Sequence, residues 1–281
     1  MSTLYLVATP IGNLGDLSPR AREILSTVDF IAAEDTRVTQ KLLTACELPR
    51  KPMISYYEHN RRARGEVVLE RMLGGETCAL VTDAGTPAVS DPGEDLVALC
   101  AEHDIPVIPV PGCCAAVCAL AASGLPTGRW CFEGFLSVNK KVRREHLDAL
   151  EGEKRTMIFY EAPHKLCATL RDLAAAFGEE RRLSLSRELT KLHEQTLRMT
   201  LGEARRYFDE NAPRGEFVLI VEGAPDEPET EQSEEERLAA AAEAVRRRME
   251  QGQTQKDAVK AVSAETGVKK NALYRYVLEN E

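Results

Sequence analysis

The chain has 281 residues, 43% of them hydrophobic, which is enough for two α/β domains or for one large domain with an appendage. Its formal net charge of −9 argues at first against a nucleic-acid partner. The charge is uneven, because seven acids and no base lie between residues 226 and 236, and the remainder carries only −2. We therefore interpret residues 226–236 as an acidic linker.

The eight cysteines lie mostly inside apolar stretches and lack the spacing of a disulfide framework, so we expect buried, reduced thiols. Cys114 and Cys118 are one helical turn apart, but no CxxC motif or nearby His supplies further ligands, and we expect no metal site. The amino terminus has no basic region, its apolar run stops at Pro10, and no stretch approaches the length of a membrane span. These features favour a cytoplasmic protein without membrane contact.

The first part of the chain alternates predicted strands with predicted helices. The loop after its first strand contains neither GxGxxG nor the P-loop pattern, so neither a Rossmann dinucleotide site nor a P-loop is supported. A polar aromatic segment at residues 55–60 is followed by Arg61, Arg62 and Arg64 and then by a predicted helix at residues 66–73. The segment is either a substrate contact or a solvated loop. The predicted strands are residues 4–8, 30–33, 78–81 and 106–110, and the helices end near residues 25, 43, 73 and 122.

Residues 80–97, LVTDAGTPAVSDPGEDLV, form a loop of small residues between a buried strand and a helix. Asp91 can act as the N-cap, with Pro92 as the first helical residue and Glu94 completing a capping box. The small residues let a ligand approach the backbone, and Asp83 leaves the strand at the usual crevice of an open α/β sheet. We therefore predict a ligand-binding loop, with an ordinary strand-to-helix connection as the alternative.

The composition changes at residues 123–126, which we interpret as the boundary between two α/β halves. The strand–loop–helix units before it predict a largely parallel sheet. Lys140, Lys141, Arg143 and Arg144 form a basic run in a predicted loop ahead of a helix, which is either a solvated face or part of the cleft. The later half contains predicted strands at residues 156–160, 182–186 and 217–221 and predicted helices at residues 165–177 and 201–208.

Beyond the acidic linker the chain changes character. Residues 237–250, 255–266 and 269–278 predict three short helices, with Gly267 in a turn and apolar residues at a spacing that buries one face. The pattern is typical of a helix-turn-helix, and from residue 237 onward nine bases oppose six acids. A small helical docking module is the alternative interpretation.

Together these patterns predict an α/β protein with a helical appendage. The predicted parts are an N-terminal α/β domain at residues 1–122, a second α/β domain at residues 123–225, the linker at residues 226–236 and an all-helical helix-turn-helix domain at residues 237–281.

Eight segments of the chain form a recognisable series. They are VATPIGNLGDLSPRA (7–21), AAEDTRVTQKLL (32–43), VTDAGTPAVSDPG (81–93), PVPGCCAA (109–116), ASGLP (122–126), FEGFL (132–136), FYEAPHKL (159–166) and SRELTKLHEQ (186–195). The series resembles the tetrapyrrole methylase superfamily, within it the branch of ribosomal RNA small subunit methyltransferases, over roughly residues 3–223. The resemblance implies 2'-O-methylation of a cytidine ribose in 16S ribosomal RNA of the small subunit, with S-adenosyl-L-methionine as cofactor. It also implies a homodimer whose two α/β domains hold the cofactor in their cleft.

The resemblance assigns the cofactor pocket to residues from both α/β halves. Cys114 stands where the superfamily usually has Ser or Thr, which leaves a backbone contact in place of a hydroxyl hydrogen bond. The implied cofactor residues are Pro10, Asp83, Ala84, Gly85, Val89, Cys114, Ala115, Tyr160, Glu161 and Leu189.

Methyl transfer to a ribose hydroxyl requires a group that orients the hydroxyl or accepts its proton. Glu34 and Asp35, at the end of the second strand, are our preferred candidates, and relatives that methylate tetrapyrroles place an acid near Glu34. His59 is the third candidate. An ion pair with Arg37 or a helix cap is the structural alternative for the two carboxylates.

Basic residues from three parts of the chain are candidates for phosphate contacts, and Tyr56 and Tyr57 are candidates for stacking on a splayed base. These basic residues are Arg61, Arg62, Arg64, Lys140, Lys141, Arg143, Arg144, Lys269, Lys270 and Arg275.

Two other functions fit part of the sequence. A tetrapyrrole-type methylase for another small molecule or a protein side chain would use the same loops, but it would leave the basic tail without a role. A ligand-sensing regulator with a DNA-binding helix-turn-helix would leave the EDTR and SRELTKLHE segments unexplained.

Overall fold

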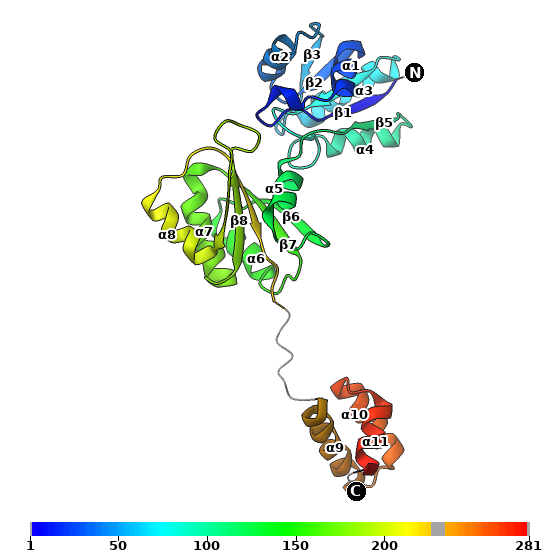
Figure 1. Ribbon diagram of the computed structural model, residues 1–281. Coiled ribbons are helices and arrows are strands. Elements are labelled where there is room, and N and C mark those ends of the chain that lie inside the picture. The colour runs from blue at the N-terminus through cyan, green and yellow to red at the C-terminus, as the bar shows by residue number, and fades with distance from the viewer. Residues whose placement is uncertain (1, 226–233, 280–281) are drawn as a thin grey trace. The chain divides into compact units, whose positions relative to one another are not determined.

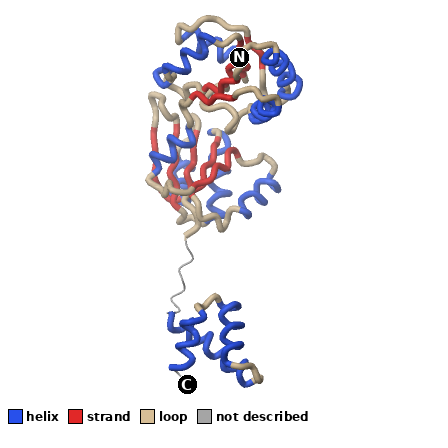
Figure 2. The backbone as a smooth tube through the Cα atoms, turned by 90° about the vertical axis from the view of Figure 1, so that its right-hand side faces the viewer, coloured by secondary structure: helices blue, strands red, loops and turns tan. Residues whose placement is uncertain are grey.

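A computed structural model describes residues 2–225 and 234–279, and the chain divides into two compact units at residues 1–224 and 225–281. Residues 226–233 of the predicted linker lie outside the described residues, whereas residues 234–236 begin helix α9 (Glu234–Glu250). Figure 2, which is coloured by secondary structure, shows strands and helices in the larger unit and helices in the described part of the smaller unit. Within the described ranges, no helix is long and apolar enough to cross a membrane.

The first sheet of the larger unit has five parallel strands in the order β3-β2-β4-β1-β5. Its strands are β1 (Leu4–Val7), β2 (Phe30–Ala33), β3 (Met53–Ser55), β4 (Cys78–Val81) and β5 (Val107–Val110). Buried side chains alternate between the two faces, so that Ala79 and Val81 of β4 pack on one side and Cys78 and Leu80 on the other. The parallel sheet that the strand–loop–helix pattern predicts is confirmed.

Helices cover both faces of this sheet (Figure 1). Side chains of α1 (Pro19–Thr27) and α2 (Thr36–Ala45) pack on one face, and those of α3 (Arg61–Leu73) and α4 (Glu94–Glu102) pack on the other. Ser18 caps α1, because its hydroxyl accepts from the Ala21 amide at 3.1 Å.

Two local predictions in this half are wrong. Helix α3 begins at Arg61, five residues earlier than predicted, so the basic cluster lies on its first turn. Helix α4 begins at Glu94 after Gly93, whose φ of +150° is open to glycine, and no side chain caps it. Asp91 is therefore not the cap, and Pro92 is not the first helical residue.

The second sheet has the order β6-β7-β10-β8-β9 and is mixed, because β6 and β7 are parallel and the other pairs are antiparallel. Its strands are β6 (Trp130–Phe135), β7 (Thr156–Glu161), β8 (Arg182–Arg187), β9 (Gln195–Thr200) and β10 (Phe217–Val221). The sequence analysis missed β6 and β9, which are the two edge strands. Both consist of half-buried and exposed residues without a buried one, so they lack a continuous apolar run.

One helix covers one face of the second sheet, and three cover the other. Helix α5 (Ala115–Ser123) packs against Ile158, Val218 and Ile220. The opposite face carries α6 (Lys140–Ala149), α7 (Pro163–Phe177) and α8 (Leu201–Glu210). The basic run at residues 140–144 is therefore helical and does not form the predicted loop. The boundary after residue 122 stays a prediction, although α5, which spans it, packs on the second sheet.

The smaller unit contains α9, α10 (Gln255–Thr266) and α11 (Lys270–Glu279). Val245, Val262 and Leu273, one from each helix, meet in its core. Gly267 ends α10 with a φ of +72°, a left-handed conformation that favours glycine. The predicted three-helix arrangement is confirmed, within about one residue at α10 and α11.

Candidate functional site

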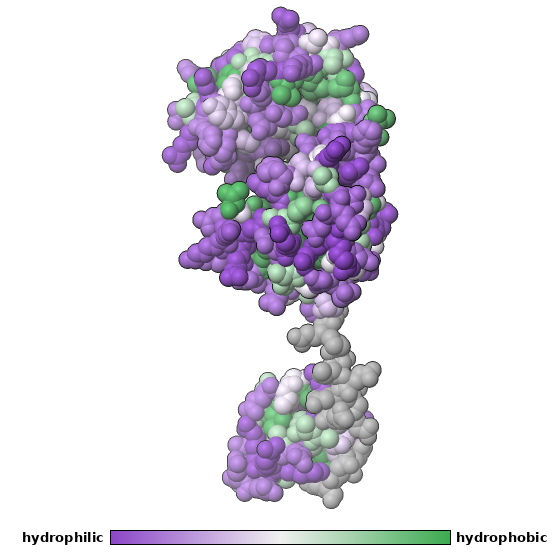
Figure 3. All heavy atoms as spheres, turned by 90° about the vertical axis from the view of Figure 1, so that its left-hand side faces the viewer, coloured by the Kyte–Doolittle hydropathy of each residue, from purple (hydrophilic) through white to green (hydrophobic). Residues whose placement is uncertain are grey.

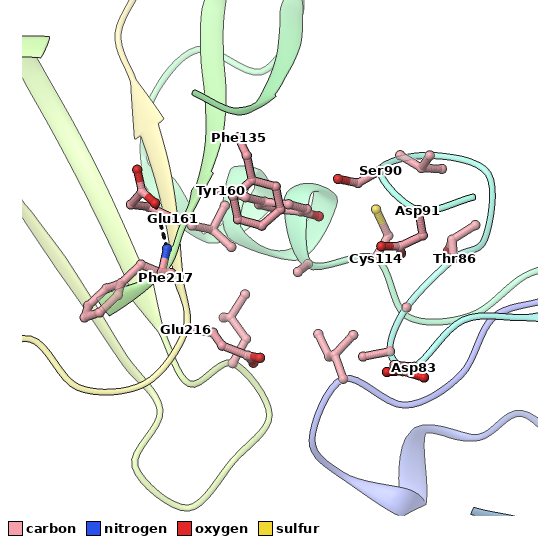
Figure 4. A pocket seen from close by; sticks show the side chains of 18 of the residues that line it. Asp83, Thr86, Ser90, Asp91, Cys114, Phe135, Tyr160, Glu161, Glu216 and Phe217 are labelled. Atoms are coloured by element: carbon pink, nitrogen blue, oxygen red, sulfur yellow. Dashed lines mark hydrogen bonds between the residues drawn. The ribbon is translucent and has the colours of Figure 1, made fainter. Parts of the chain in front are cut away.

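A cavity of about 480 Å³ lies between the two sheets of the larger unit. Loops at the carboxyl ends of β1, β4 and β5 form one wall, and residues around β6, β7 and β10 form the other (Figure 4). Its lining residues are Ile11, Asp83, Ala84, Gly85, Thr86, Val89, Ser90, Asp91, Cys114, Ala115, Phe135, Tyr160, Glu161, Ala162, Pro163, Leu189, Glu216, Phe217 and Val218. All the cofactor residues implied by the resemblance are among them except Pro10, whose neighbour Ile11 takes its place.

The wall from the first sheet, which we call the loop wall, is built from backbone. Thr9 and Gly85 exchange two backbone hydrogen bonds of 2.9 and 3.0 Å, which join the loop after β1 to the loop after β4. Gly85 has a φ of +89°, and the Thr86 hydroxyl donates to the Cys113 carbonyl at 2.8 Å. A Cβ added to Gly112 would lie 2.8 Å from the Cβ of Ala8. The chain segments of the loop wall are thus tied to one another at close range.

The wall from the second sheet, which we call the side-chain wall, consists of larger groups. The Tyr160 hydroxyl accepts from the Ala116 amide at 3.0 Å, and the Tyr160 ring meets Phe132 and Phe135 edge-on, with centroids 5.0 and 5.5 Å apart. Burial raises the pKa of Tyr160 to about 12. Phe135 is 59% exposed at the rim. Figure 4 shows the rings of Tyr160 and Phe135 on the side of the cavity opposite Asp83.

Three carboxylates gather at the loop wall. Glu34 accepts from the Asp83 amide, and Asp83 in turn accepts from the Asp35 amide, each at 3.2 Å, so the ends of β2 and β4 are joined through side chains. Burial raises the pKa of Glu34 and of Asp83. Burial, with the negative charges of Glu34 and Asp83, raises the pKa of Asp91 to about 6. A carboxylate with such a pKa in a cavity can exchange protons near neutral pH.

None of the three predicted catalytic residues, Glu34, Asp35 and His59, is among the residues that line this cavity. The Asp35 carboxylate accepts from the Arg37 amide at 2.8 Å and pairs with its guanidinium at 2.6 Å. These hydrogen bonds lower the pKa of Asp35 to about 2, which makes it a poor proton acceptor. The alternative of a helix cap and an ion pair with Arg37 thus describes Asp35. His59 is exposed and stands edge-on to Tyr57, with ring centroids 6.3 Å apart.

Comparisons with known proteins match the whole chain. The family model described as "Tetrapyrrole (Corrin/Porphyrin) Methylases" matches residues 3–205, and the one described as "RsmI C-terminal HTH domain" matches residues 236–281. Ribosomal RNA small subunit methyltransferase I of Synechocystis is 50% identical over 100% of this chain and 99% of its own. The protein of the same name from Escherichia coli O157:H7 is 45% identical over 99% of this chain and 95% of its own. The chain belongs to the ribosomal RNA small subunit methyltransferase I branch of the tetrapyrrole methylases.

Solved structures agree with this fold. A uroporphyrin-III C-methyltransferase from Thermus thermophilus has a TM-score of 0.56 and 20% identity over 78% of this chain and 93% of its own. A structure of the Thermus enzyme complexed with S-adenosylhomocysteine has a TM-score of 0.54 and 18% identity, with 78% and 97% of the two chains covered. At these identities the likeness shows the tetrapyrrole methylase fold alone.

Most of the basic residues predicted to contact RNA lie on the surface of this methylase. Arg62, Arg64, Lys140, Lys141, Arg144, Lys269, Lys270 and Arg275 are exposed. Arg61 is half-buried and pairs with Glu58 at 3.3 Å and with Asp95 at 3.8 Å. Figure 3 shows one face of the chain, on which hydrophilic residues dominate the larger unit.

Two predicted RNA contacts face inward. Arg143 is 9% exposed, pairs with Asp172 at 2.5 Å and donates to the Thr169 hydroxyl at 2.9 Å. Tyr56 is 1% exposed and donates its hydroxyl to Asp95 at 2.6 Å. In this fold a phosphate cannot reach the guanidinium of Arg143, and a base cannot stack on the ring of Tyr56. Tyr57, at 41% exposure, is still open to stacking.

Sequence reasoning missed several lining residues. Asp91 was predicted as a helix cap. Because α4 begins only at Glu94, Asp91 does not cap the helix and instead lines the cavity. Phe135 and Glu216 belong to segments that converge only through the second sheet, so no local pattern announces them. The raised pKa of Asp91 is a property of burial and of two carboxylates distant in the chain, which sequence spacing does not encode.

Proposed function

We propose that this chain transfers a methyl group from S-adenosyl-L-methionine to the 2'-hydroxyl of a cytidine ribose in 16S ribosomal RNA of the small subunit. The observation that supports the proposal is the cavity itself, where residues implied by the resemblance come together from both α/β halves. The names of the relatives supply the RNA substrate, and the family supplies methyl transfer. Ribosomal relatives also favour a cytoplasmic location.

The cavity residues fit the proposed cofactor. A volume of about 480 Å³ lies in the range of roughly 300–1,000 Å³ of pockets that hold small molecules. The small side chains of Ala84 and Gly85 would let an amino-acid moiety approach the loop closely, and Val89, Leu189 and Phe217 would give an apolar surface for adenine. The carboxylates of Asp83 and Asp91 complement a positively charged sulfonium. When bound, S-adenosyl-L-methionine supplies an electrophilic methyl group on positively charged sulfur.

The protein itself must bind the cofactor, orient the ribose hydroxyl and take its proton. A ribose hydroxyl is a weak acid, and its proton must leave as the oxygen accepts the methyl group. Asp91 lines the cavity, and above about pH 6 it is charged and able to take that proton. Glu34, our first candidate, then acts beside it: its negative charge raises the pKa of Asp91, and its bond to the Asp83 amide holds the loop.

The experiment is methyl transfer from labelled S-adenosyl-L-methionine to isolated small subunits, to free 16S RNA and to duplex DNA. We expect label in the subunit RNA, at a cytidine that resists alkaline cleavage on its 3' side because its 2'-oxygen is blocked. Label on a base, or no transfer to any RNA, would overturn the proposal. Transfer only to a small molecule or a protein would favour another tetrapyrrole-type methylase, and tight DNA binding without transfer would favour a regulator.

We further propose that the exposed bases of α3, α6 and the helix-turn-helix contact RNA phosphates. Removal of residues 226–281 should weaken RNA binding and its salt dependence, because exposed Lys and Arg side chains are lost, while cofactor binding is spared. Filter binding over a salt series measures the first effect, and calorimetry with the cofactor measures the second. Unaltered RNA affinity would give the tail another role.

The resemblance also supports a homodimer, which we propose as the state in solution. Light scattering on the purified chain tests it, and a mass near 31.1 kDa at all concentrations would contradict it.

A further inference from the structure

A chain of side chains, exposed at Asp172 and buried from Arg143 inward, runs from α6 to the cavity, and we call it the Arg143 network. It consists of Asp172, Arg143, Thr169 and Glu161. The Arg143 Nε donates to Asp172 Oδ2 at 2.5 Å, and Arg143 Nη2 donates to Thr169 Oγ1 at 2.9 Å. The Thr169 hydroxyl in turn donates to Glu161 Oε2. The Thr169 hydroxyl thus links the positive charge of Arg143 to the negative charge of Glu161.

Glu161 ends the network at the cavity but does not offer its carboxylate freely. One oxygen accepts from Thr169, and the other accepts from the Ala162 amide at 2.9 Å. Glu161 is 3% exposed and Thr169 is fully buried. The carboxylate therefore holds the turn between β7 and α7. This turn supplies four consecutive lining residues, from Tyr160 to Pro163.

Helix α6 shows why Arg143 differs from its basic neighbours. Lys140, Lys141 and Arg144 are exposed, whereas Arg143 turns inward beside Leu147. Arg143 is 9% exposed, and its guanidinium is balanced by Asp172 and, one hydroxyl away, by Glu161. Removing one member leaves a buried charged or polar group without its partner, which is costly inside a protein.

We propose that Arg143 is a positioning residue of the cofactor pocket, which acts through Thr169 and Glu161 on the turn at residues 160–163. It is not an RNA contact. The inference rests on the proposed function, because it takes the cavity as the site of S-adenosyl-L-methionine. The network also gives Glu161 a role different from direct ligand binding through its carboxylate.

The test compares two pairs of variants in the full chain. Thr169→Val removes the hydroxyl at constant shape, and Thr169→Ser keeps it. Arg143→Gln removes the buried charge, and Arg144→Gln removes the exposed charge next to it. Each variant is measured for the Kd of S-adenosyl-L-methionine without RNA, for both KM values, for kcat and for thermal unfolding.

We expect Thr169→Val and Arg143→Gln to raise the Kd and KM of the cofactor about tenfold and to leave the KM of RNA unchanged. Thr169→Ser should restore the cofactor Kd. Arg144→Gln should raise the KM of RNA alone. If Arg143→Gln does not fold, Thr169→Val against Thr169→Ser decides by the same readouts.

Two results would overturn the inference. One is a higher RNA KM for Arg143→Gln with an unchanged cofactor Kd, which makes it an RNA contact. The other is a lower unfolding temperature for Thr169→Val with an unchanged cofactor Kd, which makes the network purely structural. Failure of the wild-type chain to bind S-adenosyl-L-methionine would instead refute the proposed function, so the two failures are distinguishable.

Discussion

The two walls of the cavity solve the same task with different materials. The loop wall presents closely tied loops, fixed by the Thr9–Gly85 hydrogen bonds and by a left-handed Gly85, together with the carboxylates of Asp83 and Asp91. The side-chain wall presents Tyr160, Phe135 and Glu161, which are held by edge-on rings and by the Arg143 network. Glycine substitutions on the first wall therefore act through conformation, whereas substitutions on the second wall act through lost contacts.

The largest effect is expected at Asp91, the carboxylate of the loop wall that acts through its own chemistry. Asp91→Asn should lower kcat by about 10²–10⁴-fold, because the cavity loses its proton acceptor. For the wild-type chain kcat should fall as the pH drops through about 6, since the acid form cannot accept a proton. A pH profile of methyl transfer measures both.

Asp104→Asn is the matched control for Asp91. Asp104 is exposed, and its φ of +54° is a conformation that Asn tolerates, so no loss of kcat is expected. Equal kcat and an equal pH profile for Asp91→Asn and the wild type would show that the proton goes elsewhere, with Glu34→Gln as the next variant to measure.

A second prediction concerns conformation on the loop wall. Gly85→Ala should raise the Kd of the cofactor about tenfold, because a Cβ at a φ of +89° costs roughly 1–2 kcal/mol of strain and approaches the Ile11 Cγ2 at 3.6 Å. Calorimetric titration measures the change.

Gly75→Ala is the matched control for Gly85. Its φ is +97°, but a Cβ there would meet nothing within 4 Å, and the residue does not line the cavity. It should lower the unfolding temperature and leave the cofactor Kd unchanged. The same Kd for both variants would mean that the loop wall does not depend on the Gly85 conformation.

A smaller effect is expected on the side-chain wall. Tyr160→Phe removes the acceptor of the Ala116 amide but keeps the ring contacts, so the loss is one hydrogen bond, about 0.5–1.5 kcal/mol. The cofactor Kd should rise by a few-fold, while kcat changes little. Tyr57→Phe, at an exposed position, should change neither value. A loss of kcat at constant Kd for Tyr160→Phe would place its hydroxyl in the chemistry.

The smallest expected effect is on stability: Asp91→Asn should stabilise the fold, although it lowers activity. Because the pKa of Asp91 is raised in the folded chain, the folded state binds more protons than the unfolded one between about pH 4 and 6. This group's contribution to stability is therefore present at lower pH and is lost as the pH rises through about 6. Asp91→Asn should unfold at a slightly higher temperature than the wild type at pH 7, and the difference should shrink toward pH 4. A constant difference would contradict the raised pKa.

The first half of the fold was predictable because its central strands are short buried runs. Strands β2 and β4 match their predicted bounds. The missed strands β3, β6 and β9 are edge strands with one partner each, so their residues need not be apolar on both faces. A local pattern cannot distinguish such a strand from a loop.

The site divides in the same way. Residues carried over from motifs converge on one cavity, because the motifs mark loops at strand ends. Asp91 and Arg143 were misassigned for a shared reason: a carboxylate before a helix resembles a cap, and an arginine in a basic run resembles a surface charge. Only burial in the tertiary structure shows that the first enters the cavity and that the second pairs with Asp172.

The Thr9–Gly85 pair has a consequence for how the empty and occupied enzyme can be told apart. Both amides are hydrogen-bonded outside any continuous strand, so breaking one local bridge suffices to expose them to solvent. Their deuterium uptake reports how often the loop wall opens, without a label and without RNA. A ligand that closes over Gly85 should slow the exchange of these two amides before it alters that of the neighbouring strands.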